Sequence, residues 1–275
     1  MAISHFARRA LLLCVLLAGQ ARADLMLFPT RVVFDKNLRA AQVELINNGS
    51  EPATYRLSLV NRRMAESGEF TAIDTHGAGE LFAEPMLRFS PRQVTVQPGA
   101  SQTVRLMLRK PAELVDGEYR SHLQFDRLPD VAGASSIESK AAAEQGIGVQ
   151  LSALIGASMP VIVRHGATSA SVTLSQLEMN GKSAAPALSM LFERSGSASV
   201  YGDLTVTFTP RGGREQHLAK MGGVAVYTPN TRRRANLPLQ VPAGVALANG
   251  TLQVSYRERA DAGGAVLAQA SLALP

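Results

Sequence analysis

Residues that could do chemistry are present in the sequence, but their spacing forms no recognisable catalytic or metal site. The serine-nucleophile pattern Gly-x-Ser-x-Gly does not occur. Gly181-Lys182-Ser183 resembles the end of a phosphate loop, yet Gln176 stands where the first glycine would be needed. Asp74 and His76 could share a metal, but no third ligand follows at a typical spacing. We therefore predict a protein that is not an enzyme, with no catalytic residue, metal or cofactor.

The pattern with the most chemical content is an alternation in residues 148–164, which read GVQLSALIGASMPVIVR. Apolar and polar side chains alternate in its first half, which places one apolar row on one face of a strand. Pro160 lacks a backbone donor and suits an edge strand or a bulge. An edge strand with a spare apolar row can bind another chain by strand addition. The alternative is an ordinary strand that faces its own core. The apolar row consists of Val149, Leu151, Ala153 and Ile155.

The N-terminal residues 1–23 have the composition of a cleavable export signal. Arg8 and Arg9 precede an apolar stretch, and Ala21-Arg22-Ala23 has the small-x-small pattern of a cleavage site. The stretch is too short for a membrane span, and no later run approaches the roughly 20 apolar residues that a span needs. Cys14, the single cysteine, lies inside this leader. We therefore expect a periplasmic protein without disulfides or membrane insertion.

The composition argues against a nucleic-acid partner. The net charge of +6 falls to +3 when the leader is removed, because the leader holds three arginines and no acid. Aromatic residues make up 5% of the chain and tryptophan is absent, so platforms for stacking bases are scarce. We predict no nucleic-acid partner.

From residue 24 onward the sequence reads as short strands separated by turns. Residues 25–35 predict one opening strand, and residues 93–96, 102–108 and 117–129 predict three more. Seven further strands follow after residue 168, with turn residues such as Asn249-Gly250 between them. The length suits two β-sandwiches. We predict an all-β fold with an N-terminal domain over 24–165 and a C-terminal domain over 166–275.

The order of these motifs resembles that of the PapD-like periplasmic chaperones of the chaperone/usher pilus pathway. The resemblance rests on the leader, the opening FPTRVVFD, the segment LRFSPRQVTVQPGASQTVRL, the strand GEYRSHLQF and the strand ending in VIVR. It covers residues 25–164 well and the remainder only in architecture.

This resemblance implies two immunoglobulin-like sandwiches in an angled, boomerang arrangement, with a pilin-like subunit held between them. The chaperone lends an edge strand to the subunit and delivers it to an outer-membrane usher. Carried over to this chain, the lending side chains are Val149, Leu151, Ala153 and Ile155. Arg31 matches the family's cleft arginine, which binds the subunit's terminal carboxylate.

One position departs from the family pattern. A cleft lysine is expected four residues before Arg164, and this chain has Pro160 there. Arg164 itself resembles the family's interdomain arginine, and Glu118 resembles its acidic partner. No acid of the second domain stands out as a third member of this bridge.

Two readings of the whole chain remain open at this point. The first is a chaperone for pilus subunits. The second is an exported two-domain surface or adhesive component whose central strand is buried in its own core. The run Arg232-Arg233-Arg234 is either a solvated turn or a contact for an acidic partner.

Overall fold

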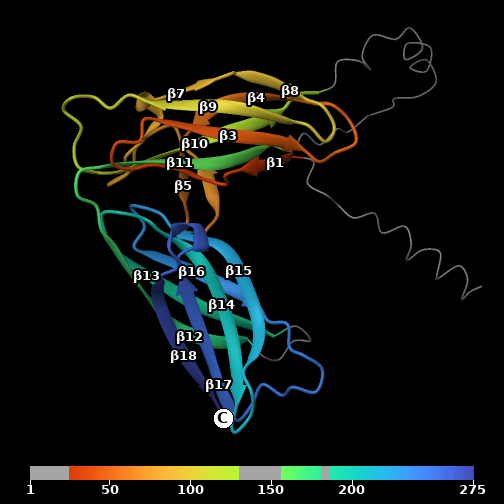
Figure 1. Cartoon of the computed structure of the whole chain (residues 1–275). Coiled ribbons are helices and arrows are strands. Elements are labelled where there is room, and N and C mark those ends of the chain that lie inside the picture. The colour runs from red at the N-terminus through yellow and green to blue at the C-terminus, as the bar shows by residue number, and fades with distance from the viewer. Residues whose placement is uncertain (1–24, 130–155, 181–185) are drawn as a thin grey trace, which may run out of the picture.

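The computed structural model describes residues 25–129, 156–180 and 186–275, which are built almost entirely from β-strands. Figure 1 shows two elongated bodies that meet at one end and are set at an angle. The prediction of an all-β fold with two sandwich domains in an angled arrangement is confirmed. The predicted leader lies outside the described residues. Within them, no helix has the length and apolar character that a membrane span requires.

The first body is a sandwich of two sheets. The four-stranded sheet has the order β1-β3-β9-β7, and the five-stranded sheet has the order β2-β11-β10-β4-β8. The strands are β1 (Leu25–Phe28), β2 (Val32–Phe34), β3 (Ala40–Asn47), β4 (Ala53–Val60), β7 (Leu87–Ser90), β8 (Gln93–Val96), β9 (Ser101–Leu108), β10 (Gly117–Arg127) and β11 (Ala157–His165).

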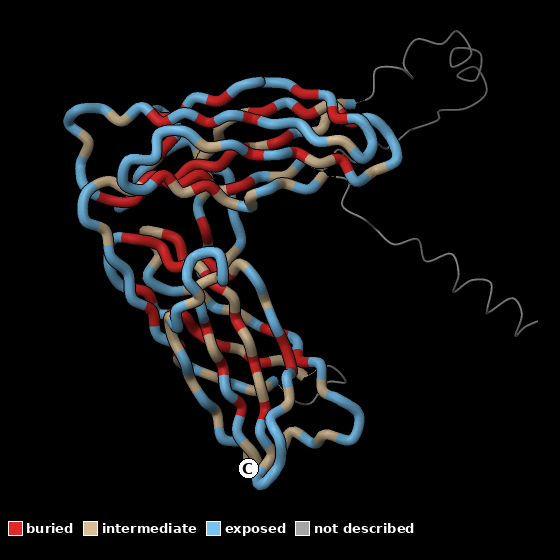
Figure 2. The backbone as a smooth tube through the Cα atoms, in the orientation of Figure 1, coloured by how far each residue is buried: buried red, intermediate tan, exposed pale blue. Residues whose placement is uncertain are grey.

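Alternating side chains of both sheets fill the core of this sandwich. Leu45 and Leu106 of one sheet and Phe125 and Val161 of the other are fully buried. In Figure 2 buried stretches alternate with exposed ones along the strands of this body. Burial of such side chains stabilises the fold by roughly 1.5–3 kcal/mol each.

The expected opening strand, residues 25–35, is in fact two strands in different sheets. β1 pairs antiparallel with β3, whereas β2 pairs parallel with β11. The change of sheet takes place over Pro29, Thr30 and Arg31. Proline cannot donate a ladder hydrogen bond, which explains why pairing stops there. The prediction of one continuous strand was therefore wrong, and Arg31 lies at the crossing point.

The second body is a sandwich of a three-stranded sheet, β12-β13-β16, and a four-stranded sheet, β15-β14-β17-β18. These seven strands are the number expected from the sequence. Their bounds are β12 (Ala170–Asn180), β13 (Ala187–Gly196), β14 (Val200–Pro210), β15 (Gln216–Val226), β16 (Arg232–Pro238), β17 (Gly250–Arg257) and β18 (Val266–Leu274).

The junction between the two bodies is apolar at its centre. Ile162 of β11 is fully buried, and it packs in the core of the second sandwich rather than the first. Val33 of β2 packs against the same cluster. The predicted boundary at residue 166 falls in the connection between β11 and β12, yet the second core reaches across it. The two bodies are therefore joined by packing as well as by the chain.

A small hairpin that sequence patterns did not indicate strengthens this junction. It consists of β5 (Arg62–Met64) and β6 (Phe70–Ala72), and in Figure 1 β5 extends from the upper body toward the lower one. The Met64 side chain is 2% exposed and belongs to the second core. The backbone oxygen of Met64 also accepts a 2.8 Å hydrogen bond from Asn230 Nδ2.

The arginine run at 232–234 forms part of the same contact. The run begins strand β16 and is not a turn. Arg234 Nε lies 2.8 Å from a carboxylate oxygen of Glu66, which belongs to the hairpin. Arg233 Nη1 donates to the backbone oxygen of Ala225. The reading of this run as a solvated turn was therefore wrong, and the acid that Arg234 contacts belongs to the same chain.

We expect Met64→Ala to lower the free energy of unfolding by about 2 to 5 kcal/mol, because it leaves a cavity in the second core. Hydrogen exchange should rise in β15 and β16 of the second body as well as in the hairpin. Met107→Ala is the matched control, since that side chain is 54% exposed, and its effect should stay within about 0.5 kcal/mol. Equal effects of the two substitutions would contradict the packing role of Met64.

Candidate functional site

The edge of β11 is partly covered by β2. β2 pairs with β11 only from Val161 to Val163. On that side of residues 157–160, no strand of the described chain is paired. Pro160 stands where the covered edge becomes the open edge, which agrees with its missing backbone donor. Arg31 immediately precedes β2, so its side chain stands at the end of the open edge.

The Arg31 side chain is unpaired among the described residues. Its guanidinium carbon lies 4.2 Å from the ring centroid of Tyr201, which comes from β14 of the second body. Its Nε atom is buried and has no hydrogen-bond partner there. A cation over an aromatic face is attracted to the ring, which also holds the flat guanidinium in one orientation. Arg31 is thus a positioned cation without a neutralising carboxylate.

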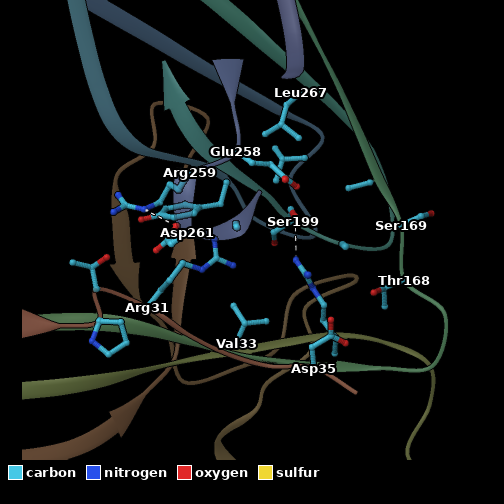
Figure 3. A pocket seen from close by; sticks show the side chains of 18 of the residues that line it. Arg31, Val33, Asp35, Thr168, Ser169, Ser199, Glu258, Arg259, Asp261 and Leu267 are labelled. Carbon is cyan, nitrogen blue, oxygen red and sulfur yellow. Dashed lines mark hydrogen bonds and ion pairs between the residues drawn. The ribbon is translucent and has the colours of Figure 1, made fainter. Parts of the chain in front are cut away.

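Arg31 lines a pocket of about 610 Å³ between the two bodies. Figure 3 shows Arg31, Val33 and Asp35 on one side of this pocket, facing residues of the second body. Arg259 contributes a second cation, but it lies 3.6 Å from Asp261 and 3.8 Å from Asp203. The lining is completed by Phe28, Pro29, Thr30, Arg164, Thr168, Ser169, Ala170, Ala198, Ser199, Val200, Tyr201, Glu258, Arg259, Asp261, Ala262 and Leu267.

Glu118 of β10 and Arg164 of β11 form an ion pair beside this pocket. Arg164 Nε donates to Glu118 Oε2 at 3.0 Å, and the Glu118 side chain is fully buried. The partners of Glu118 in the second body are Ser199 and, at 3.5 Å from Oε1, the Thr228 hydroxyl. The Ser199 backbone N–H donates to Oε2 at 3.1 Å, and its hydroxyl donates to Oε1. A neutral donor pair thus stands where an acid was sought in the sequence.

Sequence reasoning missed Ser199 and Tyr201 because neither carries a signal of its own. Both lie in the segment SASVYGD, where serine and tyrosine are unremarkable. Their role comes from the first body, which presents Glu118 and Arg31 to them. By contrast, the polar residues of β10 at 118, 120, 122 and 124 alternate visibly in GEYRSHLQF. That alternation indicates that one face of β10 carries polar side chains, and in the structure this face meets the second body.

The predicted donor row lies outside the described residues, so Val149, Leu151, Ala153 and Ile155 remain predictions. The described part of β11 faces its own core through Met159, Val161 and Val163.

The other candidate chemistry of the sequence has a structural explanation. His76 stacks on Phe82 with ring centroids 3.9 Å apart, and its Nδ1 lies 3.2 Å from the backbone oxygen of Glu80. Across residues 25–129, 156–180 and 186–275, no group of three metal-binding side chains occurs. Gly181-Lys182-Ser183 falls in a part that is not described.

Comparisons with known proteins give low identities throughout. No family model and no curated protein matches the chain. Among solved structures, the CsuC–CsuE chaperone–tip subunit complex of the archaic Csu pili of Acinetobacter baumannii aligns with a TM-score of 0.45 and 12% identity, over 91% of this chain and 97% of that one. The Pseudomonas aeruginosa CupB2 chaperone gives 0.41 and 12%, over 90% and 98%. The E. coli chaperone DraB gives 0.40 and 15%, over 91% and 98%.

These three solved structures contain chaperones. At such identities and scores, however, their activities do not transfer to this chain. Function is therefore inferred from the residues at the junction.

We expect Ser199→Ala to destabilise the protein by about 1 to 3 kcal/mol, because one buried oxygen of Glu118 loses its hydroxyl donor. Chemical denaturation of the mature chain measures this change. Ser171→Ala is the control, since that hydroxyl bonds only the exposed Ser195 and should matter little. A double-mutant cycle with Glu118→Gln should give a coupling energy well above zero. Additive effects would mean that Glu118 does not depend on Ser199.

Proposed function

We propose that this protein is a periplasmic chaperone that binds pilin-like subunits by strand addition and delivers them to an outer-membrane usher. The open edge of β11 would receive an extended segment of the subunit, and Arg31 would bind the carboxylate at the end of that segment. The single observation that carries the proposal is an arginine without an acidic partner, located where an open strand edge ends.

The direction of the bound segment follows from charge. A segment that ran parallel to β11 would lie in line with β2 and would end, with its C-terminus, beside Arg31. An antiparallel segment would instead bring a positively charged N-terminus to the same place. A guanidinium presents a rigid fork of donors that matches a carboxylate, so the parallel arrangement is favoured. The segment is thus the C-terminal end of its chain.

Specificity would come from the row Val149, Leu151, Ala153 and Ile155, on the part of the chain that leads into β11. Main-chain hydrogen bonds at a strand edge supply affinity for any extended peptide, and alternating side chains select among them. Each leucine or isoleucine buried in a subunit would contribute roughly 1.5–3 kcal/mol. A subunit whose core lacks a strand is unstable alone, which is the reason it would need such a partner. No nucleotide or metal is required by this scheme.

We expect Arg31→Ala to weaken subunit capture by about 10- to 100-fold, since a hydrogen bond to a charged group contributes roughly 1.5–3 kcal/mol. The measurement is co-purification from periplasm followed by mass spectrometry of the bound protein. Arg31→Lys keeps the charge but not the fork, so capture should recover only in part. Arg105→Ala is the control, because that side chain is exposed on the opposite sheet. Equal capture by Arg31→Ala and wild type would show that Arg31 does not bind the subunit's carboxylate.

We expect Leu151→Asp with Ile155→Asp to abolish capture while the free protein keeps its unfolding midpoint. The reason is that these side chains would enter the subunit's core rather than this protein's own. Circular dichroism melts and co-purification together measure both effects. If instead the double variant unfolds, the row is buried in this protein's own core. That outcome would favour the exported surface component over the chaperone.

A further inference from the structure

Strand β10 carries a row of polar side chains on the face that meets the second body. Arg120 is 8% exposed and His122 is 3% exposed. His122 lies opposite Pro160 in the pairing of β10 with β11. Arg62 of the hairpin joins them, because its backbone oxygen accepts a 3.1 Å hydrogen bond from Arg120 Nη2. These three residues form a basic cluster beside the junction, in which Arg120 and His122 are buried and Arg62 is half-buried.

The cluster contains three buried nitrogen atoms without a hydrogen-bond partner in the described chain. They are Arg62 Nε, Arg120 Nη1 and His122 Nδ1. The remaining bonds of the arginines are ordinary, since Arg62 Nη2 donates to Gln124 Oε1 at 2.8 Å. Buried donors are almost always satisfied in folded proteins, and an unsatisfied one costs about 1–3 kcal/mol. Arg62 Nε and Arg120 Nη1 are N–H donors in any state, whereas His122 Nδ1 is a donor in only one tautomer of the neutral ring. The two arginine donors therefore point to an acceptor that the described chain does not supply.

The acids nearest to this cluster are already bound elsewhere. Glu80 makes a two-bond pair with Arg63, at 2.6 and 2.8 Å. Glu118 is held by Arg164 and Ser199. Arg62 and Arg120 therefore carry two positive charges without a bonded carboxylate. Burial and the charge of these two arginines lower the pKa of His122 to about 3, so the imidazole is neutral near pH 7.

Two aromatic rings contact the cluster. Arg120 lies 4.5 Å from the ring centroid of Tyr227 and 5.6 Å from that of Phe70. Phe70 also meets His122 edge to face, with centroids 5.1 Å apart. Cation–π contacts offset part of the cost of burying Arg120, but they accept no hydrogen bond in the ring plane of the guanidinium.

We propose that Arg62, Arg120 and His122 form a binding site for one small monovalent anion, a halide or a carboxylate. The anion accepts hydrogen bonds from Arg62 Nε and Arg120 Nη1, and from His122 when Nδ1 carries the proton. Charge-assisted bonds of this kind are the strong ones. This site is separate from Arg31 and does not depend on the proposed function. Because Tyr227 belongs to the second body, the bound anion stabilises the junction of the two domains.

The first test is a sodium bromide soak of crystals of the mature wild-type chain, with anomalous data. We expect a bromide peak within hydrogen-bond distance of Arg62 Nε and Arg120 Nη1. Replacing bromide by acetate shows whether a carboxylate occupies the same place. The absence of any anion density at this cluster would overturn the proposal.

The second test measures thermal unfolding in sodium chloride against sodium methanesulfonate at constant ionic strength, because methanesulfonate is a much bulkier anion than chloride. Wild type should melt about 2–4 °C higher at chloride concentrations well above the dissociation constant. Arg62→Gln and Arg120→Gln should lose this difference. Arg56→Gln, an exposed control on the same sheet, should keep it. The same chloride response in all four proteins would overturn the site, and Arg62→Gln suffices if Arg120→Gln fails to fold.

Discussion

The buried carboxylate of Glu118 is the contact on which the arrangement of the two sandwiches depends. A charge taken out of water is tolerated only when it is paired and hydrogen-bonded. Arg164 supplies the charge from the first body, and Ser199 supplies two donors from the second. Separation of the bodies would leave Glu118 short of donors and would expose Ile162 and Met64. The hydrogen bonds of Glu118 and the burial of apolar side chains thus both favour the joined arrangement of the two bodies.

The junction also positions the open edge of β11, the proposed binding edge, relative to the second body. β2 covers only the last part of β11, and Arg31 stands at the point where cover ends. The ring of Tyr201, from the second body, packs against the guanidinium. The proposed anchor is therefore assembled from both domains, although its cation belongs to the first. A substitution at the junction that moves Tyr201 would therefore change the orientation of the Arg31 guanidinium, even if the substituted residue does not contact the ligand.

Surplus positive charge is a second consequence of this arrangement. The first body presents Arg31, Arg62 and Arg120 near the second body. The ring of Tyr201 meets Arg31, and the ring of Tyr227 meets Arg120. Aromatic rings offset charge only in part. Buried nitrogen atoms of Arg31 and Arg120 accordingly lack an acceptor in the described chain. The proposed terminal carboxylate at Arg31 and the proposed small anion at Arg120 would each supply an acceptor for these arginine N–H groups.

The sequence by itself determined the period-two alternation, and hence the strands, the two sandwiches and their inward rows. Arg31, Glu118 and Arg164 were singled out by the resemblance to the PapD-like chaperones rather than by the strand pattern itself. The sequence did not show that Pro29 divides the opening strand between two sheets, nor that Met64 packs in a distant core. Ser199 and Glu118 are 81 positions apart, and neither has a local signature that names the other. Only the tertiary structure decides such pairs, because a buried charge is satisfied by whatever donor the packing of distant strands brings to it.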